Sequence, residues 1–147
     1  MRKIKSLTFL VFIIFSFNSF SQIGVTSYSL YAIGINTSQN NRISGELKTY
    51  TNRIYDNIIL ELDGFYNFKP GKYHRFSVGV GVGAYPFAEF DPVHKIAFPV
   101  SLEIYPLQDF KKFSVLFELA PEYIVDDQVN LRSLWGIRYT FGKKNEK

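Results

Sequence analysis

The charged residues of this sequence recur at alternate positions within apolar stretches. Glu61 and Asp63 are two residues apart, and side chains at this spacing point to the same side of an extended strand. Two carboxylates on one face can perform acid–base chemistry, but we predict instead an ion pair with Arg75 on the neighbouring strand. The same pattern places eleven charged residues on this polar face, including these three: Glu46, Lys48, Glu61, Asp63, Arg75, Lys95, Glu103, Glu118, Glu122, Arg132 and Arg138. Six acids and five bases nearly cancel, which predicts a network of ion pairs.

The two histidines are the remaining candidates for catalysis. His74 opens a stretch of alternating residues and is interpreted as a solvated or interfacial side chain. His94 follows Asp91 closely, and with Ser133 across the fold it could form a Ser–His–acid site that hydrolyses lipids. No spacing links these three residues. We therefore expect no enzyme, no cofactor and no metal site, and keep the lipid hydrolase as an alternative.

Seven long stretches alternate with period two, which predicts β-strands. They cover residues 24–36, 42–51, 57–68, 73–86, 94–106, 112–125 and 130–141, with turn residues between them. Most are longer than the five or six residues typical of strands in globular proteins and reach the roughly 9–11 residues of a membrane-spanning strand. Pro99 and Pro121 fall inside two stretches, where we expect bulges or an open sheet edge. The glycines at 79, 81 and 83 predict a tight lumen with large neighbours or a strongly curved strand.

The apolar face of these strands has two interpretations, because alternation does not distinguish inside from outside. It faces lipid in an outer-membrane barrel and forms the core of a soluble barrel that binds an apolar ligand. Long strands, mid-strand charges and an aromatic content of 18% favour the membrane. The predicted lipid-facing residues are Phe76, Val78, Val80, Val82, Ile96, Phe98, Val100, Leu102, Val115, Phe117, Trp135 and Ile137. The predicted interfacial rings are Tyr66, Phe68, Tyr73, Phe87, Phe90, Tyr105, Phe110, Phe113, Tyr139 and Phe141.

The first 21 residues are expected to be a secretory signal peptide. Arg2, Lys3 and Lys5 precede an apolar run from Leu7 to Phe15, which is too short to span a bilayer, and Ser19 and Ser21 suit a cleavage site. Removal of this segment leaves a mature chain with a net charge near +1, so the pI of about 9.2 does not indicate nucleic-acid binding. Residues 22–142 then form one domain, and 143–147 a basic, disordered tail. The absence of cysteine excludes disulfides.

Particular phrases resemble a known group of proteins. Gln22 after the signal, Leu102-Glu103-Ile104-Tyr105-Pro106-Leu107 and Trp135-Gly136-Ile137-Arg138-Tyr139-Thr140-Phe141 are similar to small outer-membrane barrels of Bacteroidota and, more loosely, to eight-stranded OmpX/OmpA-type barrels. The resemblance implies a last strand whose Tyr139 and Phe141 are read by the barrel assembly machinery. We also expect a Gram-negative cell, contact with outer-membrane lipids and a monomer. Phe141 lies six residues from the end of the chain, which departs from that pattern.

Bacterial barrels of this kind have even strand numbers, so the seven stretches predict an eighth, poorly marked strand near the N-terminus. Either 22–37 contains two short strands, or the region 51–57 joins two, or the barrel closes irregularly. A periplasmic C-terminus places the turns at 69–72 and 107–111 in the periplasm and the loops at 52–56, 87–93 and 126–129 outside. We expect a structural or loop-mediated binding role and no pore.

Overall fold

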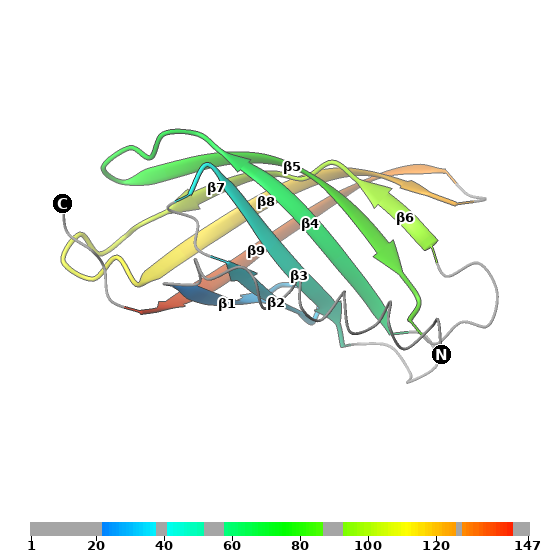
Figure 1. Cartoon of the computed structure of the whole chain (residues 1–147), viewed down its shortest axis with the longest axis horizontal. Coiled ribbons are helices and arrows are strands. Elements are labelled where there is room, and N and C mark those ends of the chain that lie inside the picture. Colours follow the sequence, from blue (N-terminus) through cyan, green and yellow to red (C-terminus); the bar gives the residue numbers. More distant parts are fainter. Residues whose placement is uncertain (1–21, 38–40, 52–57, 87–92, 126–127, 143–147) are drawn as a thin grey trace, which may run out of the picture.

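The computed structural model describes residues 22–37, 41–51, 58–86, 93–125 and 128–142. The expected signal peptide, the basic tail and most of the expected outer loops lie outside these residues. Nine strands account for most of the described chain (Figure 1). They are β1 (Ile23–Tyr28), β2 (Ala32–Thr37), β3 (Ile43–Tyr50), β4 (Ile59–Asn67), β5 (His74–Ala84), β6 (Val93–Ala97), β7 (Val100–Ile104), β8 (Phe113–Ile124) and β9 (Val129–Phe141). Among the described residues, no helix is long and apolar enough to cross a membrane.

The strands form a closed antiparallel barrel with eight positions. Strands that follow each other in the chain pair with each other, except β6 and β7, and β1 pairs with β9 from Ile23↔Phe141 to Tyr28↔Gly136, which closes the sheet. β6 and β7 share one position, because both pair with β5 on one side and with β8 on the other. The prediction of an all-β up-and-down barrel of about eight strands is confirmed.

The eighth strand comes from the first predicted stretch. Residues 24–36 are not one strand: β1 and β2 are a short hairpin joined by Ser29, Leu30 and Tyr31. Leu30 and Tyr31 adopt positive φ values of 60° and 56°, a conformation that these residue types rarely adopt. The chain therefore turns without the glycine or asparagine that usually marks such a hairpin.

The two prolines do not produce the bulges or the open edge that were expected. Val78 lies opposite Val100 and Gly81 opposite Ala97, so β6 and β7 keep one common register against β5. The carbonyl of Pro99 accepts a bond from Gly79 N at 2.8 Å, and that of Pro121 from Phe98 N at 2.9 Å. Both prolines lie level with the break between β6 and β7. Their missing N–H groups remove ladder bonds at this break without changing the register. The register shift of β5 and β6 lies elsewhere, between Gly83 and Ala84.

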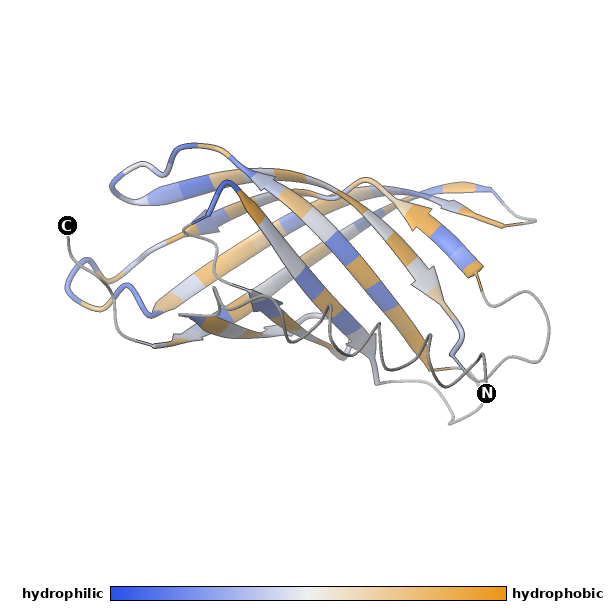
Figure 2. Cartoon of the chain, in the orientation of Figure 1, coloured by the Kyte–Doolittle hydropathy of each residue, from blue (hydrophilic) through white to orange (hydrophobic). Residues whose placement is uncertain are grey.

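The alternation separates polar and apolar side chains between the two surfaces of the wall. Figure 2 shows apolar and polar residues alternating along the strands. Of the predicted lipid-facing residues, Val78 and Val115 are half-buried and the other ten are exposed. The buried polar residues occupy the opposite surface and line the lumen. The side chains that would form the core of a soluble barrel therefore lie on its exterior.

Candidate functional site in the barrel lumen

The lumen holds all eleven charged residues of the predicted polar face. Ten are buried, and Arg132 is half-buried as a residue while its side chain is 8% exposed. They project from β3 to β9, because the two-residue spacing repeats in each strand. Such a concentration of buried charge requires partners, since an isolated buried ion costs several kcal/mol.

Lys48 joins opposite walls of the barrel. Its Nζ lies 2.7 Å from Glu118 Oε2 and 2.7 Å from Asp63 Oδ2. β3 and β8 are four positions apart in either direction around the eight-position barrel, so the ion pair of Lys48 and Glu118 crosses the full width of the lumen. An eight-stranded barrel has an interior just wide enough for side chains to fill, and this contact is a direct example.

Arg132 makes a second connection between opposite walls, from β9 to β4. Nη1 and Nη2 donate to the two carboxylate oxygens of Glu61 at 2.6 and 2.7 Å, the bidentate geometry that suits guanidinium. Nη2 also lies 3.0 Å from Glu118. Lys95 Nζ completes this group at 2.7 Å from Glu61 and 3.0 Å from Glu122. Lys48, Lys95 and Arg132 therefore belong to one connected network of ion pairs.

Arg138 and Arg75 form the part of the network closer to the end of the barrel where β1 begins and β9 ends. Arg138 Nη2 lies 3.2 Å from Glu46, and its Nη1 lies 3.5 Å from Glu103. Arg75 Nη2 lies 3.0 Å from the same Glu103. Glu103 thus receives two guanidinium groups from strands on either side of the β7–β8 pair.

The expected partner of Glu61 and Asp63 was wrong. Asp63 lies opposite Gly81 on β5, and Arg75 is six residues further along that strand, which corresponds to about 20 Å. Arg75 instead lies directly opposite Glu103. The sequence places all of these residues on one face, but strand register decides which of them meet.

Tyrosines complete the network and were missed as lumen residues. Tyr28 Oη donates to Glu46 Oε1 at 2.7 Å, and Tyr50 Oη donates to Glu61 Oε2 at 3.1 Å. Tyr105 was assigned to the interfacial rings but contacts Arg75 through its hydroxyl. Tyr50 follows Lys48 by two residues, so the alternation alone would have placed it on the polar face. These hydroxyls satisfy carboxylate and guanidinium groups that water cannot reach freely.

Glycines make the space that these side chains occupy. A Cβ at residue 83 would lie 2.7 Å from Lys95 Cγ, and one at residue 79 would lie 2.6 Å from Gly64 O. A Cβ at residue 81 would collide with Asp63 Oδ1. The interpretation of this glycine run as a tight lumen with large neighbours is supported over simple curvature.

A polar opening of about 530 Å³ lies at the end of the barrel where the chain enters β1 and leaves β9. Its lining includes Asn36, Arg75, Tyr105, Gln108, Lys112 and Thr140. Within the described residues, no cluster of three or more histidine, aspartate or glutamate side chains is arranged to hold a metal ion.

The proposed Ser–His–acid arrangement is not assembled by the described strands. His94 lies level with Val125, whose N donates to its carbonyl at 2.9 Å. Ser133 lies opposite Leu119 on β8, six residues from Val125 and thus about 20 Å along the barrel. Ser133 is also exposed on the outer surface with Trp135. The expectation that Ser133 lies near His94 was wrong, and Asp91 lies outside the described residues.

Tyr139 and Phe141, the residues of the expected assembly signal, are exposed on the outside of β9. Their rings contact each other edge to face, with centroids 4.8 Å apart. Because β9 also pairs with β1 at this level, the two rings lie at the seam where the barrel closes.

Comparison with known protein families gave no match, and neither did comparison with curated protein sequences. Among solved structures, the chain is similar to the outer membrane protein Ail of Yersinia pestis, whose backbone structure was determined in a phospholipid bilayer nanodisc. The two are 13% identical, and the match covers 82% of this chain and 97% of that chain with a TM-score of 0.48. The description of the barrel rests on its own strand pairings.

Proposed function

We propose that this chain is a small outer-membrane β-barrel protein with an ion-paired lumen, which acts structurally or through its loops and does not form a pore. The observation that carries this proposal is the distribution of charge. In the part of the wall that the structure describes, the outer surface of the strands carries no lysine, arginine, aspartate or glutamate, while eleven such residues face the lumen. A hydrocarbon environment requires this inverted arrangement, because lipid cannot solvate charge.

The alternative of a soluble barrel that binds an apolar ligand does not fit this distribution. Such a protein would bury its apolar side chains around the ligand. Here Trp135, Phe98 and Val80 are 57%, 54% and 52% exposed. An exposed apolar surface that surrounds the whole barrel is far larger than the patches of soluble monomers.

The absence of a pore follows from the two contacts between opposite walls. The pairs Lys48–Glu118 and Arg132–Glu61 fill the width of the lumen. The resemblance to small Bacteroidota barrels supports recognition of Tyr139 and Phe141 by the assembly machinery. We also expect a periplasmic C-terminus and a monomeric barrel.

The proposal is tested by cell fractionation together with gel mobility of unboiled and boiled samples. We expect the protein in the outer-membrane fraction, with a band that shifts on boiling because the barrel unfolds. Recovery in the soluble fraction without such a shift would reject the proposal.

A charged substitution on the outer wall gives a second readout. Val80→Arg places a charge midway along β5 and should cost about 2–4 kcal/mol in a bilayer, with a clear loss of the heat-modifiable band. Val93→Arg, at the end of β6, should cost at most about 1 kcal/mol and serves as the matched control. If the protein were water-soluble, both exposed valines would tolerate arginine within about 0.5 kcal/mol.

A further inference from the structure

The charged residues of the described chain fall into two groups, and only one of them is explained by the lumen. The second group lies on the connections at a single end of the barrel, between β2 and β3, between β4 and β5, and between β7 and β8. It contains five bases and one acid, exposed except for the half-buried Lys111: Arg42, Lys69, Lys72, Asp109, Lys111 and Lys112. We call this group the basic collar.

In the connections that the structure describes, the two ends of the barrel differ in charge. The opposite end carries no exposed lysine, arginine, aspartate or glutamate in the connections that the structure describes, which include Ser29–Tyr31 and Tyr85–Pro86. Within the described residues, none of the ion pairs involves a base of the collar. Lys72 Nζ lies over the exposed ring of Tyr73, 5.2 Å from its centroid, so no carboxylate of the described residues neutralises the positive charge of the collar.

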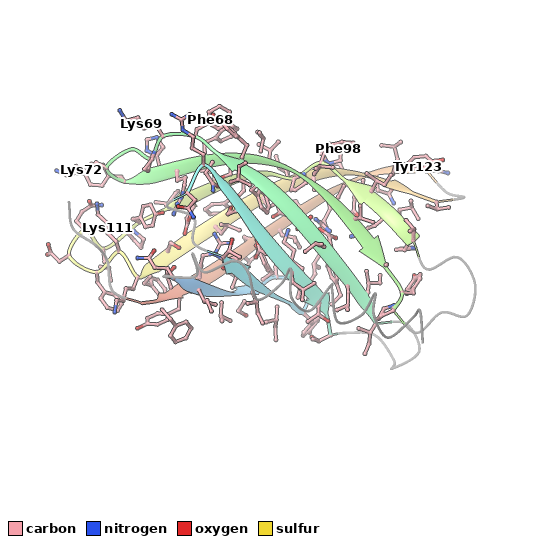
Figure 3. All side chains as sticks on the ribbon, in the orientation of Figure 1. Phe68, Lys69, Lys72, Phe98, Lys111 and Tyr123 are labelled. Atoms are coloured by element: carbon pink, nitrogen blue, oxygen red, sulfur yellow. The ribbon has the colours of Figure 1, made fainter. Side chains whose placement is uncertain are left out.

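Aromatic rings gather on the outer wall next to the basic collar. Phe68 lies 5.3 Å from Tyr66 and 5.5 Å from Phe76 between ring centroids. A second group lies on β9 and the connection between β7 and β8, where the ring centroid of Tyr139 lies 6.3 Å from that of Phe110 and 4.8 Å from that of Phe141. Figure 3 shows Phe68, Lys69, Lys72 and Lys111 at the same end of the barrel, away from Tyr123. Rings at this height are typical of the boundary between hydrocarbon and headgroups.

We propose that the basic collar binds the headgroups of anionic phospholipids in the leaflet that surrounds this end of the barrel. The inference rests on the proposed membrane location and adds the class of lipid and the end that contacts it. With the apolar wall in hydrocarbon and the rings at its edge, the lysine stems extend along the interface and place their ammonium groups among the phosphates. An anionic surface attracts each such lysine or arginine, which corresponds to up to about a fivefold preference per residue.

The test compares two spin-labelled lipids in contact with the purified full-length barrel. The barrel is reconstituted in phosphatidylcholine vesicles with a trace of labelled phosphatidylglycerol or labelled phosphatidylcholine, and the fraction of immobilised label is measured. The wild-type barrel should hold phosphatidylglycerol several-fold more strongly at low salt. The preference should fall towards one in 1 M salt, where the Debye length is about 3 Å.

Two variants make the test specific. Combined Lys69→Gln, Lys72→Gln, Lys111→Gln and Lys112→Gln substitutions should abolish most of the preference, while Asp109→Asn removes the one acid of the collar and should increase it. At constant low ionic strength, inorganic phosphate should displace no more labelled phosphatidylglycerol than chloride does; displacement beyond that of chloride would overturn the assignment to a lipid headgroup.

The outcomes separate this inference from the proposed function. A heat-modifiable barrel that holds both labelled lipids equally, or a lysine variant that keeps the wild-type preference, would overturn the basic collar as a lipid site and leave the membrane barrel intact. A chain that immobilises neither lipid and shows no heat-modifiable band would overturn both proposals.

Discussion

At the scale of single residues, the lumen is defined by cations that are shared between several carboxylates. Lys48 lies within 3.8 Å of Glu61 and 2.7 Å of both Asp63 and Glu118, so one ammonium group serves two strands besides its own. Buried ion pairs of this kind contribute little net stability, because desolvation offsets their attraction, yet removal of one partner is costly. We therefore expect the network to act mainly against wrong strand registers, which would leave a charge without a partner.

Glycine at position 81 is a second requirement at this scale. We expect Gly81→Ala to destabilise the barrel by about 1–3 kcal/mol, because its Cβ would collide with the Asp63 carboxylate and displace it from Lys48. Gly45→Ala is the matched control, since its Cβ would meet only Asp63 O at 3.7 Å. Urea unfolding in vesicles measures both variants. Equal midpoints for the two would show that the lumen accommodates the extra methyl group.

At the scale of elements, the β1–β2 hairpin carries local strain that its sequence does not relieve. Leu30 and Tyr31 have positive φ, at a cost of roughly 1–2 kcal/mol per residue. The double variant Leu30→Asn, Tyr31→Gly should therefore raise the unfolding midpoint, by an amount that corresponds to about 1 kcal/mol or more. Tyr73→Gly, at an exposed position without positive φ, should not stabilise the barrel. A lower midpoint for the double variant would indicate that the two side chains contribute more through their contacts than they cost through strain.

This hairpin also shows why the strand count was difficult to predict. Tyr28 and Ala32 are both buried and pair with each other across the connection Ser29–Tyr31. A three-residue connection moves the chain on by an even number of positions, so the period-two pattern continues through the turn without a break. With no glycine, proline or asparagine in the connection, neither pattern nor composition marks it.

The other strands and the two faces were predictable because their signals are strong and local. Val80 and Trp135 lie on the apolar face that their parity predicted, and this face is exposed, as the membrane interpretation expected. The fold class follows from the same alternation. The partner of Arg75 was not predictable, because register depends on connection lengths and on Pro99, whose effect on the strand is not visible in the pattern. The inward position of Tyr105 was missed for a different reason: it follows Glu103 by two residues, so alternation places it on the polar face, but its aromatic ring was assigned to the interface.

At the scale of the whole molecule, the described barrel has two chemical surfaces and a basic collar at one end. The wall is apolar outside and ionic inside, and Lys69, Lys72 and Lys111 of the collar lie at the same end (Figure 3). The exterior favours insertion in a bilayer, and the collar favours one orientation relative to anionic headgroups. The lumen contributes neither of these properties. Its consequence is closure, and closure can be measured separately from insertion.

The last prediction concerns that closure. Wild-type barrels in a planar bilayer should show no conductance steps, because Lys48 and Arg132 each bridge opposite walls. A variant with small or neutral side chains should conduct ions while retaining a paired Lys95 and Glu122. Its substitutions are Lys48→Ser, Glu61→Ser, Asp63→Asn, Glu118→Ser and Arg132→Ser. The four-lysine variant of the basic collar, which leaves the lumen unchanged, should remain closed. A conducting wild-type barrel would contradict a sealed lumen, and so would a heat-modifiable five-residue variant that stays silent, since the removed side chains would then not be what closes the barrel.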